Sequence, residues 1–486
     1  MFRYVLVSIA LAWPAVAQDF RLDEFDVPQG IEFQTRGPIH EAFAEPVVYD
    51  PQPGYTVPRQ PPDPIEELPP DEQPEGDDVA WISGYWAWDE DRNNFIWVSG
   101  IWRNLPPGKQ FIPGYWTQVD GGWQWVSGFW YNLRERPVAY LPQPPESLEV
   151  GPSSEPPAPD HIWVPGVWLY RESRYVWRPG YWLAPQPQWT WVPAHYVWTP
   201  SGYVFVGGYW DYEIVERGML FAPAYIEPAV IRRPAFVYRP QLVVDSTVLI
   251  DFLFARPRHR HYYFGDYFGR DYFQRGIYPT YAFHQSRYGY DPIFVSYYAR
   301  HRLQDPNWFD RLRSQYRYRR DHADARPPRV FRPDRVSGGG GLVIARPIQQ
   351  FVRSPNPSIR LRRMDDVARQ QVRQRITGAR DVREQRRKLE LGAVNRSPLR
   401  APDRSQARPL ELSIPRSPLA GRPLRSASAA QQPAATPGSV IQRQVPDRPG
   451  ADRPTPNATP DRTTPRTVVP REQTGTPGQT IQRPAP

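Results

Sequence analysis

The chain of 486 residues has 62 prolines, no cysteine, and 60 basic against 51 acidic side chains, for a net charge of +9 at pH 7. The prolines and a mean hydropathy of -0.66 predict long segments without a packed core, and thus fewer than the roughly three domains that this length allows. The lack of cysteine excludes disulfides, thiolate metal sites and Cys-linked lipid anchors, so packing alone must stabilise the fold.

The charge is divided between two halves of the chain. Residues 18–227 contain 30 acidic and 12 basic residues, a net charge of -18, whereas residues 228–486 contain 21 and 47, a net charge of +26. Almost all of the basic residues in the second half are arginines. This asymmetry predicts either different partners for the two halves or contact between them.

The N-terminus has the three parts of a secretory signal. Arg3 precedes an apolar run over 4–13, and Ala15-Val16-Ala17 forms a cleavage site, so we predict a signal peptide over residues 1–17. The apolar run is too short for a membrane span, which takes about 20 residues. The same holds for 242–255, which also contains two aspartates. We therefore expect an exported protein of the periplasm, cell envelope or extracellular space, without a transmembrane span.

Composition divides the remainder of the chain into segments. An acidic, proline-rich, aperiodic stretch predicts a disordered leader, a tryptophan-rich array follows, and a Tyr/Arg/His-rich segment predicts mixed strands and helices. Beyond a glycine-rich hinge at 337–341 lies a basic Pro/Arg/Thr-rich tail, which we predict to be disordered except for one amphipathic helix. The predicted bounds are 18–78 for the leader, 79–227 for the array with a proline-rich insert at 136–160, 228–336 for the mixed segment, 337–486 for the tail and 364–391 for its helix.

The array repeats one motif, aromatic-x-Ser/Pro-Gly-x-Trp, mostly at steps of 14 residues. Alanine replaces the glycine at Ala194 and Ala222. Repetition at a fixed period indicates a repeat architecture, in which the glycines have a structural role. The repeat glycines are Gly84, Gly100, Gly114, Gly128, Gly166, Gly180 and Gly208.

With WISGYW, WVSGIW, FIPGYW, WVSGFW, WVPGVW and WRPGYW, the array resembles the WXXGXW (or YXWGXW) repeat proteins over roughly residues 81–226. The resemblance implies an exported bacterial protein of a mostly uncharacterised family and supplies no catalytic residues. The departures WVPAHY at 191–196 and MLFAPA at 219–224 indicate that the repeat decays toward its C-terminal end.

Fourteen residues suit one extended strand and a turn, so we predict a mainly β fold in which the repeats form an antiparallel meander. Asp120-Gly121-Gly122 has the composition of such a turn. In an alternative reading, Pro-Gly is the centre of a type II turn and pairs its flanking tryptophans across a tight hairpin. One copy buries too little to offset the entropy of ordering it, which predicts a quasi-one-dimensional stack of neighbours.

Aromatic rows on a sheet can also bind sugars. If one face of the array is open, either Tyr85, Tyr115 and Tyr181 or the last tryptophans of the motifs form a glycan platform; if neither face is open, the same rings form the core, which we favour. The candidate platform tryptophans are Trp86, Trp102, Trp116, Trp130, Trp168, Trp182 and Trp210.

The mixed segment offers a candidate metal site and two helix starts. His259 and His261 form an H-x-H pair that could hold a metal with His284, His301 or His322, but we favour a surface loop and expect no metal or other cofactor. Asp291-Pro292 and Asp305-Pro306 each predict the first turn of a helix.

Enzyme motifs are absent, and a carboxylate pair such as Asp211 and Glu213 would need a separation that sequence does not give, so we expect no enzyme. Interleaved arginine and tyrosine at 311–322 suit an anionic polymer. The sequence thus predicts a non-enzymatic envelope or extracellular scaffold whose basic tail contacts anionic surface polymers. The alternative is a module that binds cell-wall polysaccharide or exopolysaccharide.

Overall fold

The computed structural model describes residues 25–333, 343–353, 359–394 and 409–423, all within one compact unit that ends at Arg425. The predicted signal peptide, the glycine-rich hinge and the last part of the tail, 424–486, lie outside the described residues. The fold is mainly β and antiparallel, as predicted, with helices concentrated toward the C-terminal end.

Two consecutive copies of the motif pair to form one long antiparallel hairpin, here called a double repeat. Each arm of the hairpin is broken into two short strands at the Ser-Gly or Pro-Gly dipeptide, here called the step. In the first double repeat, Trp86 pairs with Trp97 near the turn, and Trp81 pairs with Trp102 beyond the step. The chain therefore runs through the step in extended form, which confirms the strand reading; the tight Pro-Gly hairpin is wrong.

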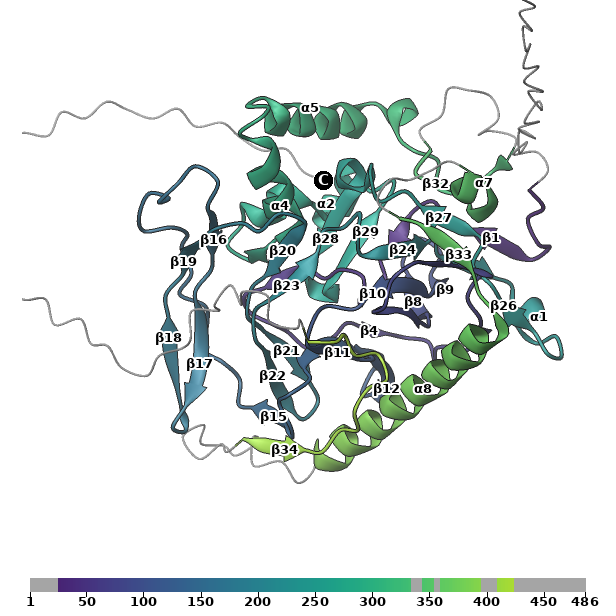
Figure 1. The fold of residues 1–486 in the computed structure, drawn as a ribbon, viewed down its shortest axis with the longest axis horizontal. Coiled ribbons are helices and arrows are strands. Elements are labelled where there is room, and N and C mark those ends of the chain that lie inside the picture. Colours follow the sequence, from purple (N-terminus) through teal and green to yellow (C-terminus); the bar gives the residue numbers. More distant parts are fainter. Residues whose placement is uncertain (1–24, 334–342, 354–358, 395–408, 424–486) are drawn as a thin grey trace, which may run out of the picture. The chain divides into compact units, whose positions relative to one another are not determined.

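Residues 79–212, all of them described, contain four double repeats (Figure 1). The first consists of β7 (Val79–Ile82), β8 (Tyr85–Asp89), β9 (Asn94–Val98) and β10 (Ile101–Asn104), and the second of β11 (Lys109–Ile112), β12 (Tyr115–Val119), β13 (Gly122–Val126) and β14 (Phe129–Asn132). The third consists of β16 (Ile162–Val164), β17 (Val167–Arg171), β18 (Arg174–Arg178) and β19 (Tyr181–Leu183), and the fourth of β20 (Trp189–Val192), β21 (His195–Thr199), β22 (Gly202–Val206) and β23 (Tyr209–Tyr212).

A ninth, degenerate copy closes on the first double repeat instead of forming its own hairpin. Its strands β24 (Gly218–Phe221) and β25 (Ala224–Ile226) pair with β10 and β9. The sheet then continues from β24 to β27 (Leu242–Val244) and β32 (Ala345–Pro347). The largest hydrophobic cluster likewise combines repeat residues with residues from the leader and from the mixed segment. The double repeats share a common core, which differs from the predicted one-dimensional stack.

The predicted disordered leader is wrong for residues 25–78, which pack against the array. Strand β1 (Ile31–Phe33) pairs with β25, and β4 (Thr56–Val57) pairs with β13. Phe33 and Phe43 are buried in the core. Composition was misleading because the acidic side chains of this segment have partners in the array, as described below. The other short strands here are β2 (Gly37–Pro38), β3 (Val47–Val48), β5 (Glu66–Glu67) and β6 (Glu72–Pro74), and the insert contributes β15 (Val138–Leu141).

Residues 228–333 mix strands and helices. The strands are β26 (Val237–Tyr238), β28 (Leu253–Arg256), β29 (His261–Phe264), β30 (Tyr278–Pro279) and β31 (Gly289–Tyr290); the helices are α1 (Pro228–Ile231), α2 (Arg270–Gln274), α3 (Thr280–His284), α4 (Pro292–His301) and α5 (Trp308–Asp321), with 3-10 turns at Leu249–Phe252, Pro257–His259 and Ala323–Ala325. The Asp291 carboxylate accepts from Phe294 N at 2.9 Å and caps α4 as predicted. Helix α5 starts later than predicted, because Asn307 rather than Asp305 is its N-cap residue.

The described parts of the tail also pack on the array, so the prediction of disorder is wrong there. Helix α7 (Ile348–Arg353) and strands β33 (Leu361–Arg363) and β34 (Leu410–Leu412) flank a long helix, α8 (Asp366–Val394), which lies where a helix was predicted for 364–391. It runs along the edge of the unit (Figure 1) and buries Val372, Ile376 and Ala379. In the described parts of the chain, no helix combines the length and apolarity that crossing a membrane requires.

Candidate functional site

The motif aromatics meet in cross-strand pairs. In each pair the first aromatic of one copy faces the last aromatic of its partner copy, and the ring centroids lie 5.1–5.4 Å apart, tilted or edge to face. This geometry favours aromatic pairs beyond their burial. The pairs are Trp81–Trp102, Trp86–Trp97, Phe111–Trp130, Trp116–Trp125, Trp163–Trp182, Trp168–Trp177, Trp191–Trp210 and Tyr196–Phe205.

The candidate aromatic platform does not exist as one open face, which agrees with the favoured core role of these rings. Trp86, Trp102 and Trp130 are only 3%, 1% and 5% exposed. The tyrosines Tyr85 and Tyr115 are buried as well. The remaining candidates are half-buried, namely Trp116, Trp168, Trp182, Trp210 and Tyr181. The rings are mainly part of the core, because each packs against its partner ring across the hairpin.

The motif glycine leaves room for an indole. A Cβ atom on Gly180 would lie 2.3 Å from the Trp163 ring, and one on Gly100 would lie 2.4 Å from the Trp81 ring. Both distances are too short for any real contact, so only glycine lets the indole lie on the backbone. The other repeat glycines are crowded in the same way, Gly84 by Trp97, Gly114 by Trp125, Gly128 by Phe111, Gly166 by Trp177 and Gly208 by Trp191.

The step interrupts the β-ladder and leaves backbone N–H groups without a partner on the paired strand. A glutamate from outside the repeat accepts hydrogen bonds from these groups. In the first double repeat, Glu67 of the leader accepts from Gly84 N (2.6 Å), Gly100 N (2.8 Å) and Trp97 Nε1 (2.9 Å). One carboxylate thus satisfies three buried donors of the motif. Charge-assisted bonds of this kind are about twice as strong as neutral ones.

The second and third double repeats hold a glutamate in the same way. Glu41 of the leader accepts from Gly128 N (3.0 Å), Gly114 N (3.3 Å) and Trp125 Nε1 (3.3 Å). Glu149 of the proline-rich insert accepts from Gly166 N and from Trp163 Nε1 (2.9 Å). We call Glu41, Glu67 and Glu149 the step glutamates. Glu67 and Glu149 each lie 17 residues before the first glycine of their double repeats, whereas Glu41 lies 73 residues before Gly114. Sequence reasoning missed all three, although the spacing of 17 was a signal for two of them.

Burial and hydrogen bonding act in opposite directions on these carboxyl groups. Burial raises the pKa of Glu67 to about 7, against the three N–H donors that favour its charge. Burial likewise raises the pKa of Glu41 to about 6. On the other side of the second step, Arg386 of α8 donates to the carbonyls of Pro113 (2.9 Å) and Ser127 (3.0 Å). The step is therefore held by opposite charges from the leader and the tail.

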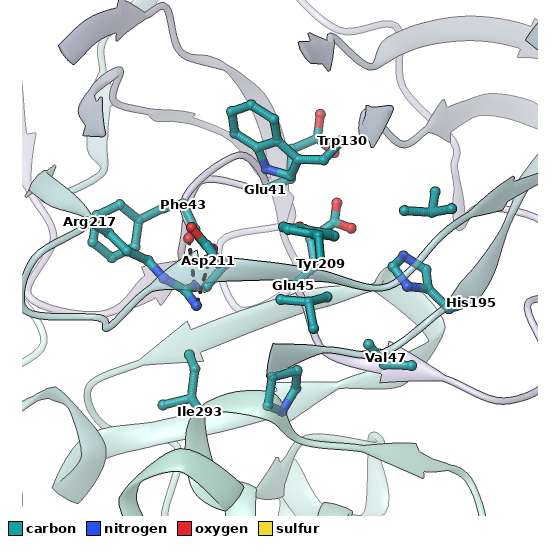
Figure 2. Close-up of a pocket in the computed structure, with 14 residues that line it drawn as sticks. Glu41, Phe43, Glu45, Val47, Trp130, His195, Tyr209, Asp211, Arg217 and Ile293 are labelled. Atoms are coloured by element: carbon teal, nitrogen blue, oxygen red, sulfur yellow. Dashed lines mark hydrogen bonds and ion pairs between the residues drawn. The ribbon is translucent and has the colours of Figure 1, made fainter. Parts of the chain in front are cut away.

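A cavity with polar groups lies where the leader meets the second and fourth double repeats (Figure 2). Asp211 accepts from Arg103 at 2.6 Å and pairs with Arg217 at 3.2 Å, all three nearly fully buried. Glu213 pairs instead with Arg300, so both carboxylates of the candidate pair Asp211 and Glu213 are occupied by arginines. These ion pairs fix the leader to the array, since both arginines also donate to carbonyls of residues 42 and 43.

Two further titratable groups line the same cavity. Burial raises the pKa of Glu45 to about 8, although Arg260 lies 2.9 Å away, and lowers the pKa of His195 to about 3. Both are therefore held mainly neutral near pH 7. Almost all of the residues that line the cavity are buried, so we assign it a structural role.

The candidate metal histidines are used in packing. His261 lies 2.7 Å from the Tyr85 hydroxyl, and His259 stacks on Tyr55 with ring centroids 3.8 Å apart. Both are buried, which corrects the predicted surface loop. Across the described residues, no group of three or more His, Asp or Glu side chains is arranged to hold a metal ion.

Array indoles line an open groove at the third double repeat. This hairpin pairs with no other described strand, and it stands at the side of the unit (Figure 1). The groove lies between β16 and β19, the insert, and helices α3 and α4, and has an empty volume of about 1270 Å³ including its mouth. Half-buried Trp163 and Trp182 line it together with Tyr298.

Polar and basic groups complete the groove. Arg302 donates to the His161 carbonyl at 3.0 Å, while its Nε is buried and has no partner among the described residues. The Tyr290 hydroxyl, in a side chain 1% exposed, also lacks a described partner. Arg287 lies at the exposed rim. Indoles beside unpaired donors and arginines suit a ligand with both ring faces and acidic groups.

Comparison with known families agrees with this geometry. A model of the WXXGXW repeat, which comprises two copies, matches residues 76–103, 111–130, 159–182 and 188–212, and each match coincides with one double repeat. No curated protein and no solved structure matches the chain significantly. The four double repeats within residues 76–212 are therefore WXXGXW repeats.

Proposed function

We propose that this protein is an exported, non-enzymatic scaffold of the cell envelope or extracellular space that binds an acidic polysaccharide in the groove of the third double repeat. The N-terminal signal pattern supports export. The observation that carries the binding proposal is the groove itself, where Trp163 and Trp182 reach an open cleft beside Arg287 and Arg302.

The chemistry of the groove favours an acidic glycan over a neutral one. Indole faces stack on the apolar faces of sugar rings, and arginine makes bidentate contacts with carboxylates. Glu149, the acidic residue of the lining, already accepts from Gly166 N and Trp163 Nε1. Its charge is thus partly compensated and opposes an anionic ligand less than a free carboxylate would.

The described part of the basic tail offers fewer free arginines for this role than the sequence indicated. In the described part of the tail, Arg386 is fully buried and Arg369 and Arg387 are engaged in ion pairs. These arginines serve the fold, so we place contact with anionic envelope polymers in the groove instead.

Affinity electrophoresis tests the proposal, with the full chain run through gels containing polygalacturonate or neutral dextran. We expect polygalacturonate to retard the unmodified chain. The affinity derived from this retardation should fall at least tenfold for Trp182→Ala, which removes the stacking ring. Arg287→Gln should weaken binding to polygalacturonate and leave the migration in dextran unchanged. Arg258→Gln, another exposed arginine outside the groove, is the matched control. Equal retardation of all variants, or no retardation of the unmodified chain, would show that the groove does not bind an acidic polysaccharide.

A further inference from the structure

A second cleft, which differs from the groove of the third double repeat in its chemistry, lies under α5. Helices α2, α3 and α5 surround it, Phe254 of β28 lines it, and its empty volume is about 940 Å³ including the mouth. Figure 1 shows α5 at the outer edge of the unit with α2 beside it. The lining is mainly aromatic and aliphatic, with Phe254, Tyr267, Phe268, Phe273, Ile277 and Tyr316 among its residues.

The aromatic interior of this cleft offers few hydrogen-bonding groups to a ligand. The Tyr316 hydroxyl already donates to the Leu253 carbonyl at 2.6 Å. Phe273 is 55% exposed and contacts Tyr278 edge to face at 4.9 Å, so an apolar ring remains open to solvent at the side of the cleft. A peptide or a glycan would leave its polar groups unpaired here, whereas an acyl chain has none to satisfy.

Three arginines line the same cleft. Arg270 is 82% exposed at its side chain, Arg320 is 43% exposed, and Arg317 is also exposed. Asp321 is shared by Arg320 at 2.9 Å and Arg270 at 3.9 Å. The Arg317 side chain makes no ion pair or hydrogen bond with any residue in the described ranges. The cleft therefore combines an apolar interior with an excess of positive charge.

We propose that this cleft binds a fatty acid, with its acyl chain over Phe254 and Phe268 and its carboxylate at Arg317 and Arg320. The charge complementarity explains why arginines surround an apolar cleft, since guanidinium groups hold a carboxylate at its open end. Arg319 on the same helix differs, because it lies over the Phe252 ring at 4.4 Å and serves packing. The inference is independent of the glycan groove, which is formed by other residues.

Displacement of a dansyl-labelled undecanoic acid from the full chain tests the proposal. We expect the probe fluorescence to rise on binding, and palmitate to displace the probe at least tenfold more strongly than methyl palmitate, which has no charge. The double variant R317Q/R320Q should bind palmitate with at least tenfold lower affinity and bind methyl palmitate with unchanged affinity. Both side chains are exposed, so circular dichroism should show an unaltered fold.

Arg313→Gln is the matched control, because Arg313 is on the same helix but lies over Phe309, outside the cleft. It should bind palmitate like the unmodified chain. The proposal is overturned if the probe does not bind, if the ester competes as well as the acid, or if R317Q/R320Q binds palmitate with unchanged affinity.

Discussion

The step glutamates explain how a motif that breaks its own β-ladder remains stable. A buried backbone N–H without a partner costs roughly 1–3 kcal/mol, and each step exposes more than one. Glu67 and Glu41 each satisfy two glycine N–H groups and one indole N–H. In the fourth double repeat, Trp191 Nε1 has no partner among the described residues, so this arrangement is not general.

Titration of Glu67 should appear in the pH dependence of stability. Its folded-state pKa of about 7 lies above the ordinary 4.5, so the folded chain binds this proton more tightly than the unfolded chain. Its protonation therefore stabilises the fold fully below pH 4.5, and this contribution is lost as the pH rises through 7. We expect the free energy of unfolding of the unmodified chain to fall relative to Glu67→Gln over this range in urea titrations.

The comparison with Glu67→Gln cancels the other buried carboxyl groups, which titrate in both proteins. A difference between the two proteins that stays constant from pH 4.5 to 8 would show that Glu67 keeps an ordinary pKa. A rise that lies mainly below pH 4.5 would show instead that its three N–H donors outweigh its burial and lower its pKa.

Neighbouring glycines separate steric need from simple flexibility. A Cβ at Gly208 would lie 2.6 Å from the Trp191 ring, whereas a Cβ at Gly207 would meet nothing within 4 Å. Gly208→Ala should therefore destabilise the fold by about 1–3 kcal/mol through overpacking, and Gly207→Ala by less than about 0.5 kcal/mol. Urea unfolding followed by tryptophan fluorescence measures both, and equal losses would contradict the steric explanation.

At the scale of elements, sequence predicts what is local. The 14-residue period gave the antiparallel strands of the array because each copy brings its own turn and pairs with the adjacent copy. The leader could not be predicted in this way, since Glu41 and Gly128 lie 87 residues apart. The same applies to the groove, because Trp182 and Tyr298 come together only through tertiary packing.

Helix α8 contains one buried ion pair whose two members hydrogen-bond to the array, which gives an element-scale prediction. Arg386 and Glu390 are both 0% exposed and 2.8 Å apart, and Glu390 also accepts from Tyr115 and Tyr140. Arg386→Met leaves this carboxylate without its cation and should cost about 3–5 kcal/mol of unfolding free energy. Lys388→Ala, on the exposed side of the helix, should cost almost nothing.

The double variant R386M/E390M distinguishes charge from packing. Replacing both members of a buried pair by apolar side chains is often close to neutral, so we expect it to recover most of the loss in urea unfolding. If the double variant is as unstable as Arg386→Met, then the hydrogen bonds that the pair makes to the second step and to the two tyrosines, rather than the unpaired charge on Glu390, stabilise the contact.

For the whole molecule, the division of charge is in part a folding device. Acidic residues of the leader and basic residues of the tail meet on the array. At the second step, Glu41 accepts hydrogen bonds from the glycine N–H groups, and Arg386 donates to the carbonyls of Pro113 and Ser127. This supports contact between the two halves of the chain, one of the two outcomes that the charge asymmetry predicted. The array therefore depends on segments that composition alone marked as disordered.

A fragment of the array alone should consequently fail to fold. Residues 79–227 lack two of the step glutamates, Glu41 and Glu67, and the whole of helix α8. They also lack strands β1, β4 and β34, which pair with β25, β13 and β15, respectively. We expect this fragment to show no cooperative urea transition and no protected amides in hydrogen exchange, whereas a chain of residues 25–425 unfolds cooperatively. The fragment keeps every motif aromatic, so its failure would assign the missing stability to the flanking segments. A cooperative transition of the fragment at the same midpoint as the longer chain would show instead that paired indoles suffice and that the step glutamates are dispensable.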